Sequence, residues 1–276
     1  MDLGLAILLT DYSMSPAALG ASAEEHGFES LFLAEHTHIP TSRETPYPGG
    51  IDLPREYSHI IDPFVGLAAA ATATERLKVG TGICLVNQHD PIVTAKEVAT
   101  LDHISNGRFL FGVGAGWNKE EMRNHAIDPS TRWGEMRERV AAMKAIWTEE
   151  EAEYHGRYVD FDPIWSWPKP VQKPHPPVLV GGTGPKALDR VLRYGDIWMP
   201  NRIAEPGWLK DRIAELRDRA GRRVPVTYYG ADAADEFVAA LADAGVDRVL
   251  LQLPDAGADE VLPLVERYAE MAARHR

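Results

Sequence analysis

Short apolar runs alternate with helical segments along most of this chain. The first run, 3–9, is followed by a helix over 17–26 that Ser15 can cap and Pro16 can open, and a second run follows at 30–34. Strands joined by short connections through a helix lie parallel in one sheet, with a right-handed crossover. The chain is therefore predicted to begin as a β-α-β unit.

The same alternation continues towards the C-terminus, where apolar positions at helical spacing separate further apolar runs. The predicted strands are 3–9, 30–34, 78–86, 108–113, 178–180, 196–199, 224–229 and 248–253. This alternation predicts a (β/α)8 TIM barrel with insertion loops, in which 1–276 form a single domain. A doubly wound sheet is the alternative, although it would normally need fewer strands or a second domain.

Two segments interrupt the alternation. The stretch 35–61 is rich in proline and glycine without a helical or alternating period, and structureless loops of this length are usually functional. The stretch 163–177 combines many prolines with Trp165 and Trp167, which predicts an ordered insertion lying on the body of the protein. Between them, a helical stripe is expected to pack in the core: Trp133, Met136, Val140, Met143 and Trp147.

Composition narrows the class of partner. The net charge of −12 argues against nucleic acid, and a hydrophobic content of 45% is ordinary for a globular protein. No window approaches the roughly 18 consecutive apolar residues of a membrane helix. We therefore expect a cytoplasmic enzyme that acts on a small molecule. The single cysteine, Cys84, excludes an intrachain disulfide.

In a (β/α)8 barrel the chemistry lies where strands end. The candidate strand ends are 35–38, 80–84, 114–118, 181–184, 200–202, and Gln252 with Asp255. Two of them are rich in glycine: Gly112, Gly114 and Gly116 close the fourth strand, and 181–184 follow the fifth. Each alone is equally explained by a barrel corner or a short turn. Together they favour a phosphate-bearing cofactor, with free amides and Lys186 opening the next helix.

Glu35 and His36 form the single acid–base pair at a predicted strand end, and a histidine titrating near neutrality can move a proton. The alternative is a histidine that anchors the long loop, and His38 and His59 are weaker candidates. No metal is expected, because the other strand ends offer Asp255 and few further ligands. The sequence has no GxSxG, dinucleotide-binding fingerprint or P-loop, and Cys84 has no evident base.

Several stretches together resemble the bacterial luciferase-like monooxygenase superfamily, and within it the branch that uses the deazaflavin coenzyme F420. The stretch 109–118 (FLFGVGAGWN) is similar to the strand-four signature of these proteins. The other similar stretches are 101–109 (LDHISNGRF), 167–172 (WPKPVQ), 178–184 (VLVGGTG) and 193–198 (RYGDIW). The predicted seventh and eighth strands are similar to the family only in the alternation of strands and helices.

The resemblance implies a role for each motif. Gly82 and Ile83 fall where the family often has a non-proline cis peptide beneath the ring of the cofactor, and His36 falls where deazaflavin dehydrogenases place an active-site histidine beside an acid, here Glu35. The residues implied to hold the phosphate tail are Gly114, Ala115, Gly116, Trp117, Asn118, Gly181, Gly182, Thr183 and Gly184. Some relatives have a glutamate where this chain has Trp117, so a sugar-phosphate substrate is not expected.

The leading hypothesis is an oxidoreductase that transfers a hydride between F420 and an unidentified small organic substrate, with His36 supplying or receiving a proton. One alternative is an FMN-dependent monooxygenase, and another is a cofactor-binding protein without turnover. The segment with Trp165 and Trp167 suggests a homodimer.

Overall fold

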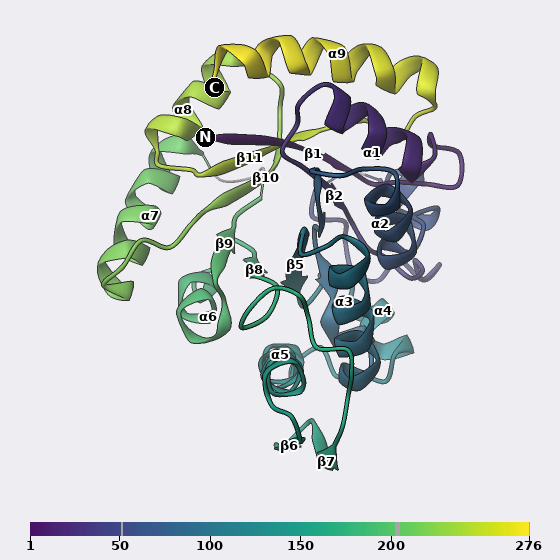
Figure 1. Cartoon of the computed structure of the whole chain (residues 1–276), viewed down its shortest axis with the longest axis vertical. Helices are drawn as coiled ribbons and strands as arrows, with labels where there is room; N and C mark the ends of the chain where they lie inside the picture. The colour runs from purple at the N-terminus through teal and green to yellow at the C-terminus, as the bar shows by residue number, and fades with distance from the viewer. Residues whose placement is uncertain (51, 202–204, 276) are drawn as a thin grey trace.

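Eight parallel strands form a nearly closed barrel in the computed structural model, which describes residues 1–50, 52–201 and 205–275 (Figure 1). The barrel strands are β1 (Asp2–Ile7), β2 (Ser30–Leu33), β3 (Lys78–Thr81), β5 (Phe109–Gly114), β8 (Val178–Gly181), β9 (Ile197–Met199), β10 (Thr227–Ala231) and β11 (Arg248–Gln252). Their order around the sheet is β10-β11-β1-β2-β3-β5-β8-β9. Parallel bridges from Trp198 to Val226 and from Asn201 to Tyr229 join the two end strands. The predicted TIM barrel is confirmed, and the doubly wound alternative is wrong.

Helices cover the outside of the barrel (Figure 1). They are α1 (Pro16–Glu25), α2 (Pro63–Thr72), α3 (Pro91–Ile104), α4 (Lys119–Asn124), α5 (Arg132–Thr148), α6 (Ala187–Tyr194), α7 (Pro206–Ala220), α8 (Asp235–Asp243) and α9 (Ala258–Arg274). The first three begin at a proline behind a capping side chain, since Ser15, Asp62 and Asp90 each accept a hydrogen bond from a first-turn amide. These caps fix where each connection ends and its helix begins.

The apolar core has two parts. The larger part lies between the strands and the helices, and the smaller part fills the barrel with side chains that include Phe32, Leu179 and Leu250. A Cβ atom on Gly80 would lie 2.5 Å from the ring of Phe32, so the glycine leaves room for this aromatic side chain. The interior is packed, and open space is left for a ligand at the mouth of the barrel.

Three predicted elements differ from the structure. The expected strand 78–86 ends at Thr81. The cis peptide Gly82–Ile83 follows, and the chain continues as the two-residue strand β4 (Cys84–Leu85) and a 3-10 turn, η2 (Val86–Gln88). A short helix, α4, follows Asn118 in a polar stretch for which no helix was predicted. The seventh strand lies at Thr227–Ala231 rather than at 224–229.

The proline-rich insertion at 163–177 is ordered, as predicted, and the expected structureless loop at 35–61 contains a short 3-10 turn. The hairpin β6 (Ala152–His155) and β7 (Asp160–Ile164) follows α5, and a second 3-10 turn, η1 (Arg55–Ser58), lies in the long loop. The proline-rich segment is tied to α3, since Gln172 Nε2 donates to Asp102 Oδ1 at 2.7 Å and His103 Nε2 lies 2.8 Å from the carbonyl oxygen of Lys169. Among the described helices, none has both the length and the apolar character needed to cross a membrane.

An ion cluster joins three strands at the end of the barrel opposite the mouth. Glu29 accepts two hydrogen bonds of 2.7 Å from the guanidinium of Arg248 and lies 2.7 Å from Lys78 Nζ. Burial alone would raise the pKa of Glu29, but these two cations lower it to about 2. The cluster therefore links the starts of β2, β3 and β11 with charge-assisted bonds.

Candidate active site

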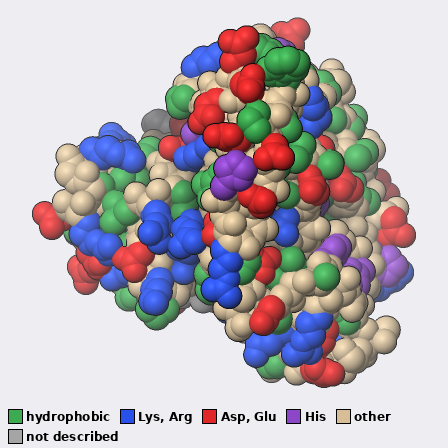
Figure 2. Space-filling view, turned by 90° about the horizontal axis from the view of Figure 1, so that it is seen from below, with side chains coloured by type: hydrophobic (Ala, Val, Ile, Leu, Met, Phe, Trp, Pro, Cys, Tyr) green, Lys and Arg blue, Asp and Glu red, His purple; other side chains and the backbone are tan. Residues whose placement is uncertain are grey.

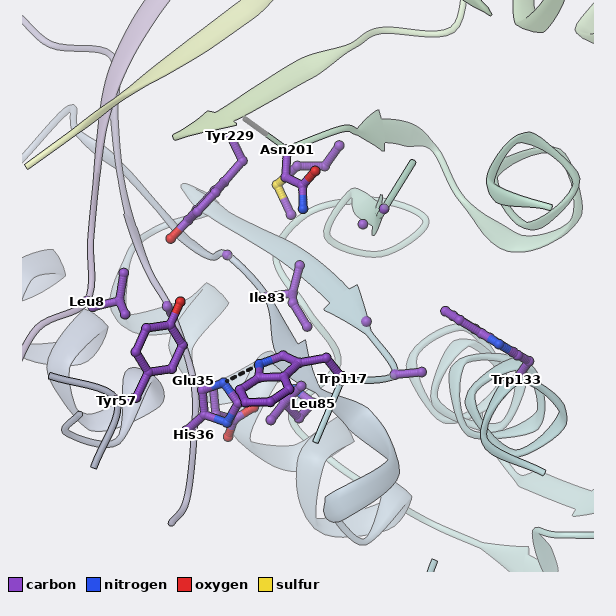
Figure 3. Close-up of a pocket in the computed structure, with 18 residues that line it drawn as sticks. Leu8, Glu35, His36, Tyr57, Ile83, Leu85, Trp117, Trp133, Asn201 and Tyr229 are labelled. Carbon is purple, nitrogen blue, oxygen red and sulfur yellow. Dashed lines mark hydrogen bonds between the residues drawn. The ribbon is translucent and has the colours of Figure 1, made fainter. Parts of the chain in front are cut away.

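A cavity of about 330 Å³ opens at the C-terminal ends of the barrel strands (Figure 3). It is lined by Leu8, Ala34, Glu35, His36, Tyr57, Gly82, Ile83, Leu85, Gly114, Ala115, Gly116, Trp117, Trp133, Gly181, Gly182, Met199, Asn201 and Tyr229. Most of the residues predicted for catalysis and cofactor binding thus meet in one place. Their roles stay predictions.

Ile83 lies on two glycines in this cavity. A Cβ atom on Gly114 would lie 2.4 Å from Ile83 Cδ1, and a Cβ atom on Gly181 would lie 3.0 Å from Ile83 Cγ2. Only glycine at these two positions lets the isoleucine lie against the strand ends without moving. On the other side, a Cβ atom on Gly82 would lie 2.3 Å from the ring of Tyr229. Ile83 therefore presents an apolar surface to the cavity, at a position that requires glycine at both 114 and 181.

The strand-four glycines serve different purposes. Gly112 lies inside the barrel wall, where a Cβ atom would approach the carbonyl oxygen of Thr81 to 1.9 Å, so close strand packing explains this glycine. Gly116 has φ +76°, a conformation that favours glycine. Gly114 and Gly116 line the cavity, whereas Gly112 does not.

The glycine-rich turn after β8 is open to a ligand. Gly182 has φ +112°, and a Cβ atom on Gly182 or Gly184 would meet nothing within 4 Å. Gly184 lies outside the central cavity and lines a neighbouring groove together with residues of α5 and α6, and Thr183 lines neither. The predicted phosphate seat is therefore divided between the central cavity and this groove.

His36 is held by two partners in the cavity wall. Its Nδ1 lies 2.8 Å from Glu121 Oε2, and the indole N–H of Trp117 donates to its Nε2 at 3.2 Å, the bond drawn in Figure 3. An indole nitrogen can only donate, so Nε2 is an acceptor and the proton of the neutral imidazole lies on Nδ1, directed at the carboxylate. The tautomer of His36 is thus fixed by its neighbours, with the Nε2 lone pair facing Trp117.

Glu121 was not among the predicted site residues. It is fully buried in α4, and its Oε1 has no hydrogen-bond partner among the described residues. Asn118 caps this helix, because its Oδ1 accepts from the amides of Glu120 and Glu121 at 3.1 Å. The signal was present as an Asn-x-x-Glu spacing, which normally marks a capping box. Here the glutamate turns to His36 instead of back to the cap.

Two more predicted site residues differ from expectation, one in its position and the other in its partner. Asn118 is buried as a helix cap and does not line the cavity. Glu35 does not pair with His36: its Oε2 accepts from the amide of Leu85 at 2.5 Å, and its Oε1 lies 2.6 Å from His89 Nε2. Successive side chains of an extended segment point to opposite sides, so Glu35 and His36 point away from each other although they are neighbours in the sequence. The carboxylate links the end of β2 to β4, and a direct proton-transfer role for it stays a prediction.

A buried polar cluster surrounds Glu35. Burial acts against charge on His89, but the hydrogen bond and charge of Glu35 raise its pKa. Burial, then the charge of Glu35, raise the pKa of the Cys84 thiol well above its usual value. Possible ligand atoms of Glu35, Cys84 and His89 lie within 4.8 Å of one another. Because both carboxylate oxygens already accept hydrogen bonds, this trio has a structural explanation, and the expectation of no metal stays a prediction.

The weaker candidates, His38, His59 and Asp255, form hydrogen bonds with residues that do not line the central cavity. His38 Nε2 lies 2.8 Å from Asn124 Nδ2, and His59 Nδ1 lies 3.0 Å from Asp11 Oδ1. Asp255 accepts a 2.5 Å hydrogen bond from the hydroxyl of Tyr12. Arg202 lies outside the described residues.

The aromatic stripe on α5 is core packing, with one exception. Met136, Val140, Met143 and Trp147 are buried as predicted, whereas Trp133 is 37% exposed. Trp133 stands across the cavity from Tyr57 (Figure 3) and borders both the cavity and the groove beside Gly184. The periodicity of the stripe did not reveal this, because helical spacing does not show that the first turn of α5 borders a cavity.

The sequence matches known proteins along nearly its whole length. The profile described as "Luciferase-like monooxygenase" matches residues 17–244. An uncharacterized protein of Mycobacterium tuberculosis is 41% identical over 281 residues, 99% of both chains. An FMNH2-dependent dimethylsulfone monooxygenase of Pseudomonas putida is 33% identical over 55% of this chain and 42% of its own. An F420-dependent glucose-6-phosphate dehydrogenase of Nakamurella multipartita is 28% identical over 75% of this chain and 59% of its own.

Solved structures agree on the fold. A monooxygenase from Streptomyces bottropensis superposes with a TM-score of 0.79 at 22% identity. An F420-dependent secondary alcohol dehydrogenase gives the same TM-score at 19% identity. Each comparison covers 100% of this chain and 99% of the other chain. A monooxygenase and an F420-dependent dehydrogenase therefore share this barrel.

Proposed function

This chain belongs to the luciferase-like monooxygenase family, and we propose that it is an oxidoreductase that transfers a hydride between coenzyme F420 and a small organic substrate. The observation that carries the proposal is the position of His36, held between Glu121 and Trp117 in the wall of the cavity. Interconversion of an alcohol and a carbonyl compound needs one proton for each hydride, and this imidazole is placed to handle it.

The residues present fit a cofactor with a flat ring and a phosphate. Ile83, lying on Gly114 and Gly181, offers an apolar surface that no side chain interrupts, and the open turn at Gly182 offers free space for a phosphate. When bound, F420 supplies hydride chemistry at its ring. The protein holds and orients that ring, and the long loop brings Tyr57 to the cavity to exclude water.

The proton moves through one atom in this scheme. Nε2 of His36 exchanges its bond with Trp117 for a bond with the substrate hydroxyl, from which it accepts the proton during alcohol oxidation. Glu121 keeps Nδ1 protonated and stabilises the imidazolium that results, as a buried carboxylate does for a catalytic histidine. In the reverse direction the imidazolium returns the proton to the developing alkoxide.

A flavin monooxygenase is the second candidate, because the Pseudomonas putida relative uses FMNH2. Oxygen activation does not require the histidine–glutamate arrangement, so we favour the hydride-transfer reaction. The test is titration of the protein with F420 and with FMN under identical conditions, with fluorescence as the measure of binding. We expect micromolar or tighter binding of F420 and weaker binding of FMN. Tight FMN binding without F420 binding would overturn the proposal.

A further inference from the structure

A basic groove lies beside the active-site cavity, between α5 and α6. Its volume is about 730 Å³, and it begins at Gly184, where the predicted phosphate seat ends. Trp133 separates the groove from the cavity and lines both. In Figure 2, Lys and Arg side chains gather on the face seen from below, where α5 and α6 lie. A ligand whose phosphate lies at the turn after β8 can therefore extend directly into the groove.

The charge of the groove is opposite to that of the whole chain. Five cations line it: Arg132, Arg137, Lys186, Arg190 and Arg193. Its one carboxylate, Asp189, is bound by Arg219 at 2.6 Å. Within the part of the chain that the structure describes, Arg137 alone of the five forms an ion pair with a carboxylate, on Glu138. A protein with a net charge of −12 thus concentrates unpaired positive charge at this point.

The walls of the groove carry buried polar atoms that no described residue satisfies. The hydroxyl of Tyr194 has no hydrogen-bond partner although the residue is only 8% exposed, and the Nε atoms of Arg132 and Arg190 are also unpaired. Burial raises the pKa of Tyr194 to about 12, so the hydroxyl is a donor at neutral pH. Buried polar atoms are normally paired, and three unpaired donors in one groove indicate a missing acceptor.

The groove is also held in shape before any ligand binds. The guanidinium of Arg190 lies 3.8 Å from the ring centroid of Trp133, and that of Arg132 lies 5.1 Å from the same ring. Stacking fixes both planes, so less side-chain entropy is lost when an anion binds. Lys186, Arg190 and Arg193 follow at spacings of four and three, which places them on one side of α6.

We propose that this groove is a binding subsite for a chain of carboxylates that continues from the phosphate of the cofactor. The inference rests on the proposed function, because F420 carries an oligoglutamate tail beyond its phosphate whereas FMN ends there. The arginines bind the carboxylates, and the hydroxyl of Tyr194 donates to one of them. Such a subsite would distinguish F420 from FMN by the tail, in addition to the contacts that both rings make with Ile83.

The test compares F420 carrying several glutamates with F420 from which the glutamates have been removed, by titration and fluorescence. For the natural protein we expect the tailed form to bind at least tenfold more tightly, with a stronger dependence on salt. Arg190→Gln and Arg193→Gln should each weaken the tailed form roughly threefold to tenfold and leave the tail-free form unchanged. Arg222→Gln, an exposed change outside the groove, is the matched control.

Each result of these titrations supports or overturns the proposed subsite. Equal affinity for the two forms, or equal losses for both in the arginine variants, would overturn the subsite and leave the proposed function standing. Failure of both forms to bind the natural protein would overturn the two together. If Arg190→Gln disturbs folding through Trp133, the exposed Arg193→Gln still gives the answer.

Discussion

The apolar surface beneath the proposed cofactor ring depends on the missing side chain at Gly114. In Gly114→Ala the new Cβ atom would lie 2.4 Å from Ile83 Cδ1 and 3.0 Å from Ile83 Cγ1, well inside the usual contact of roughly 3.5–4.0 Å between carbon atoms. Ile83 must move by about 1 Å. On the other side Ile83 already lies against the backbone of Gly181, where even an added Cβ atom would be only 3.0 Å from Ile83 Cγ2. The side chain therefore moves up into the cavity.

Overpacking of this size costs roughly 1–3 kcal/mol. In the free protein the cavity accommodates the displaced isoleucine, so the free energy of unfolding should fall by less than about 1 kcal/mol. In the complex the ring competes for the same space, so the dissociation constant of whichever of F420 and FMN binds should rise about 5-fold to 150-fold. Fluorescence titration measures the affinity, and urea denaturation measures the stability.

The matched control is Gly207→Ala, a helical glycine whose Cβ atom would meet nothing within 4 Å. It should leave the affinity unchanged. Ile83→Val removes Cδ1, so the double variant Gly114→Ala/Ile83→Val should bind more tightly than Gly114→Ala alone. Binding by Gly114→Ala with the natural affinity would refute this account of the surface.

Three further expectations concern His36 and the ion cluster. Glu121→Gln should slow turnover of a small alcohol roughly tenfold, because a neutral amide stabilises the imidazolium less well; an unchanged kcat would remove Glu121 from the mechanism. Trp117→Phe deletes the indole donor that competes with substrate, so KM should fall about twofold to tenfold, and an unchanged KM would contradict this. Glu29→Gln should lower the free energy of unfolding by roughly 2–3 kcal/mol at pH 7. Because the pKa of Glu29 is lowered to about 2 from 4.5, that difference should shrink as pH falls from 4.5 towards 2, and urea denaturation at pH 7 and pH 3 tests it.

The barrel was predictable because its signal is repeated. Each apolar run and each capped helix is a local feature, and the order of these features leaves few possible topologies. The break after Thr81 was not predictable from periodicity, because the apolar character of 78–86 continues through it. The resemblance to the family, rather than the pattern, identified Gly82 and Ile83.

The sequence predicted which strand ends would line the cavity, but it did not predict the hydrogen-bond partners of His36 and Glu35. Strand ends converge by geometry, so His36, Gly114 and Gly181 met as expected. The partner of His36 was missed because it comes 85 residues later, from a six-residue helix that the polar sequence after Trp117 concealed. Glu35 was paired wrongly because proximity in sequence was taken for proximity of side chains. Such contacts depend on which way a strand's last residues face, and this is decided by tertiary packing.

The bond between Trp117 and His36 also affects how the resting protein meets other reagents. Nε2 is the atom that acylating and alkylating agents attack and that soft divalent metals bind, and the indole N–H already occupies its lone pair. In the free protein Nε2 of His36 is therefore masked, and only 7% of the His36 side chain is exposed. Diethyl pyrocarbonate should modify His36 slowly in the natural protein and faster once Trp117 is replaced by phenylalanine. A tryptophan in this motif would thus protect the imidazole until, in the proposed reaction, a substrate hydroxyl takes the place of the indole.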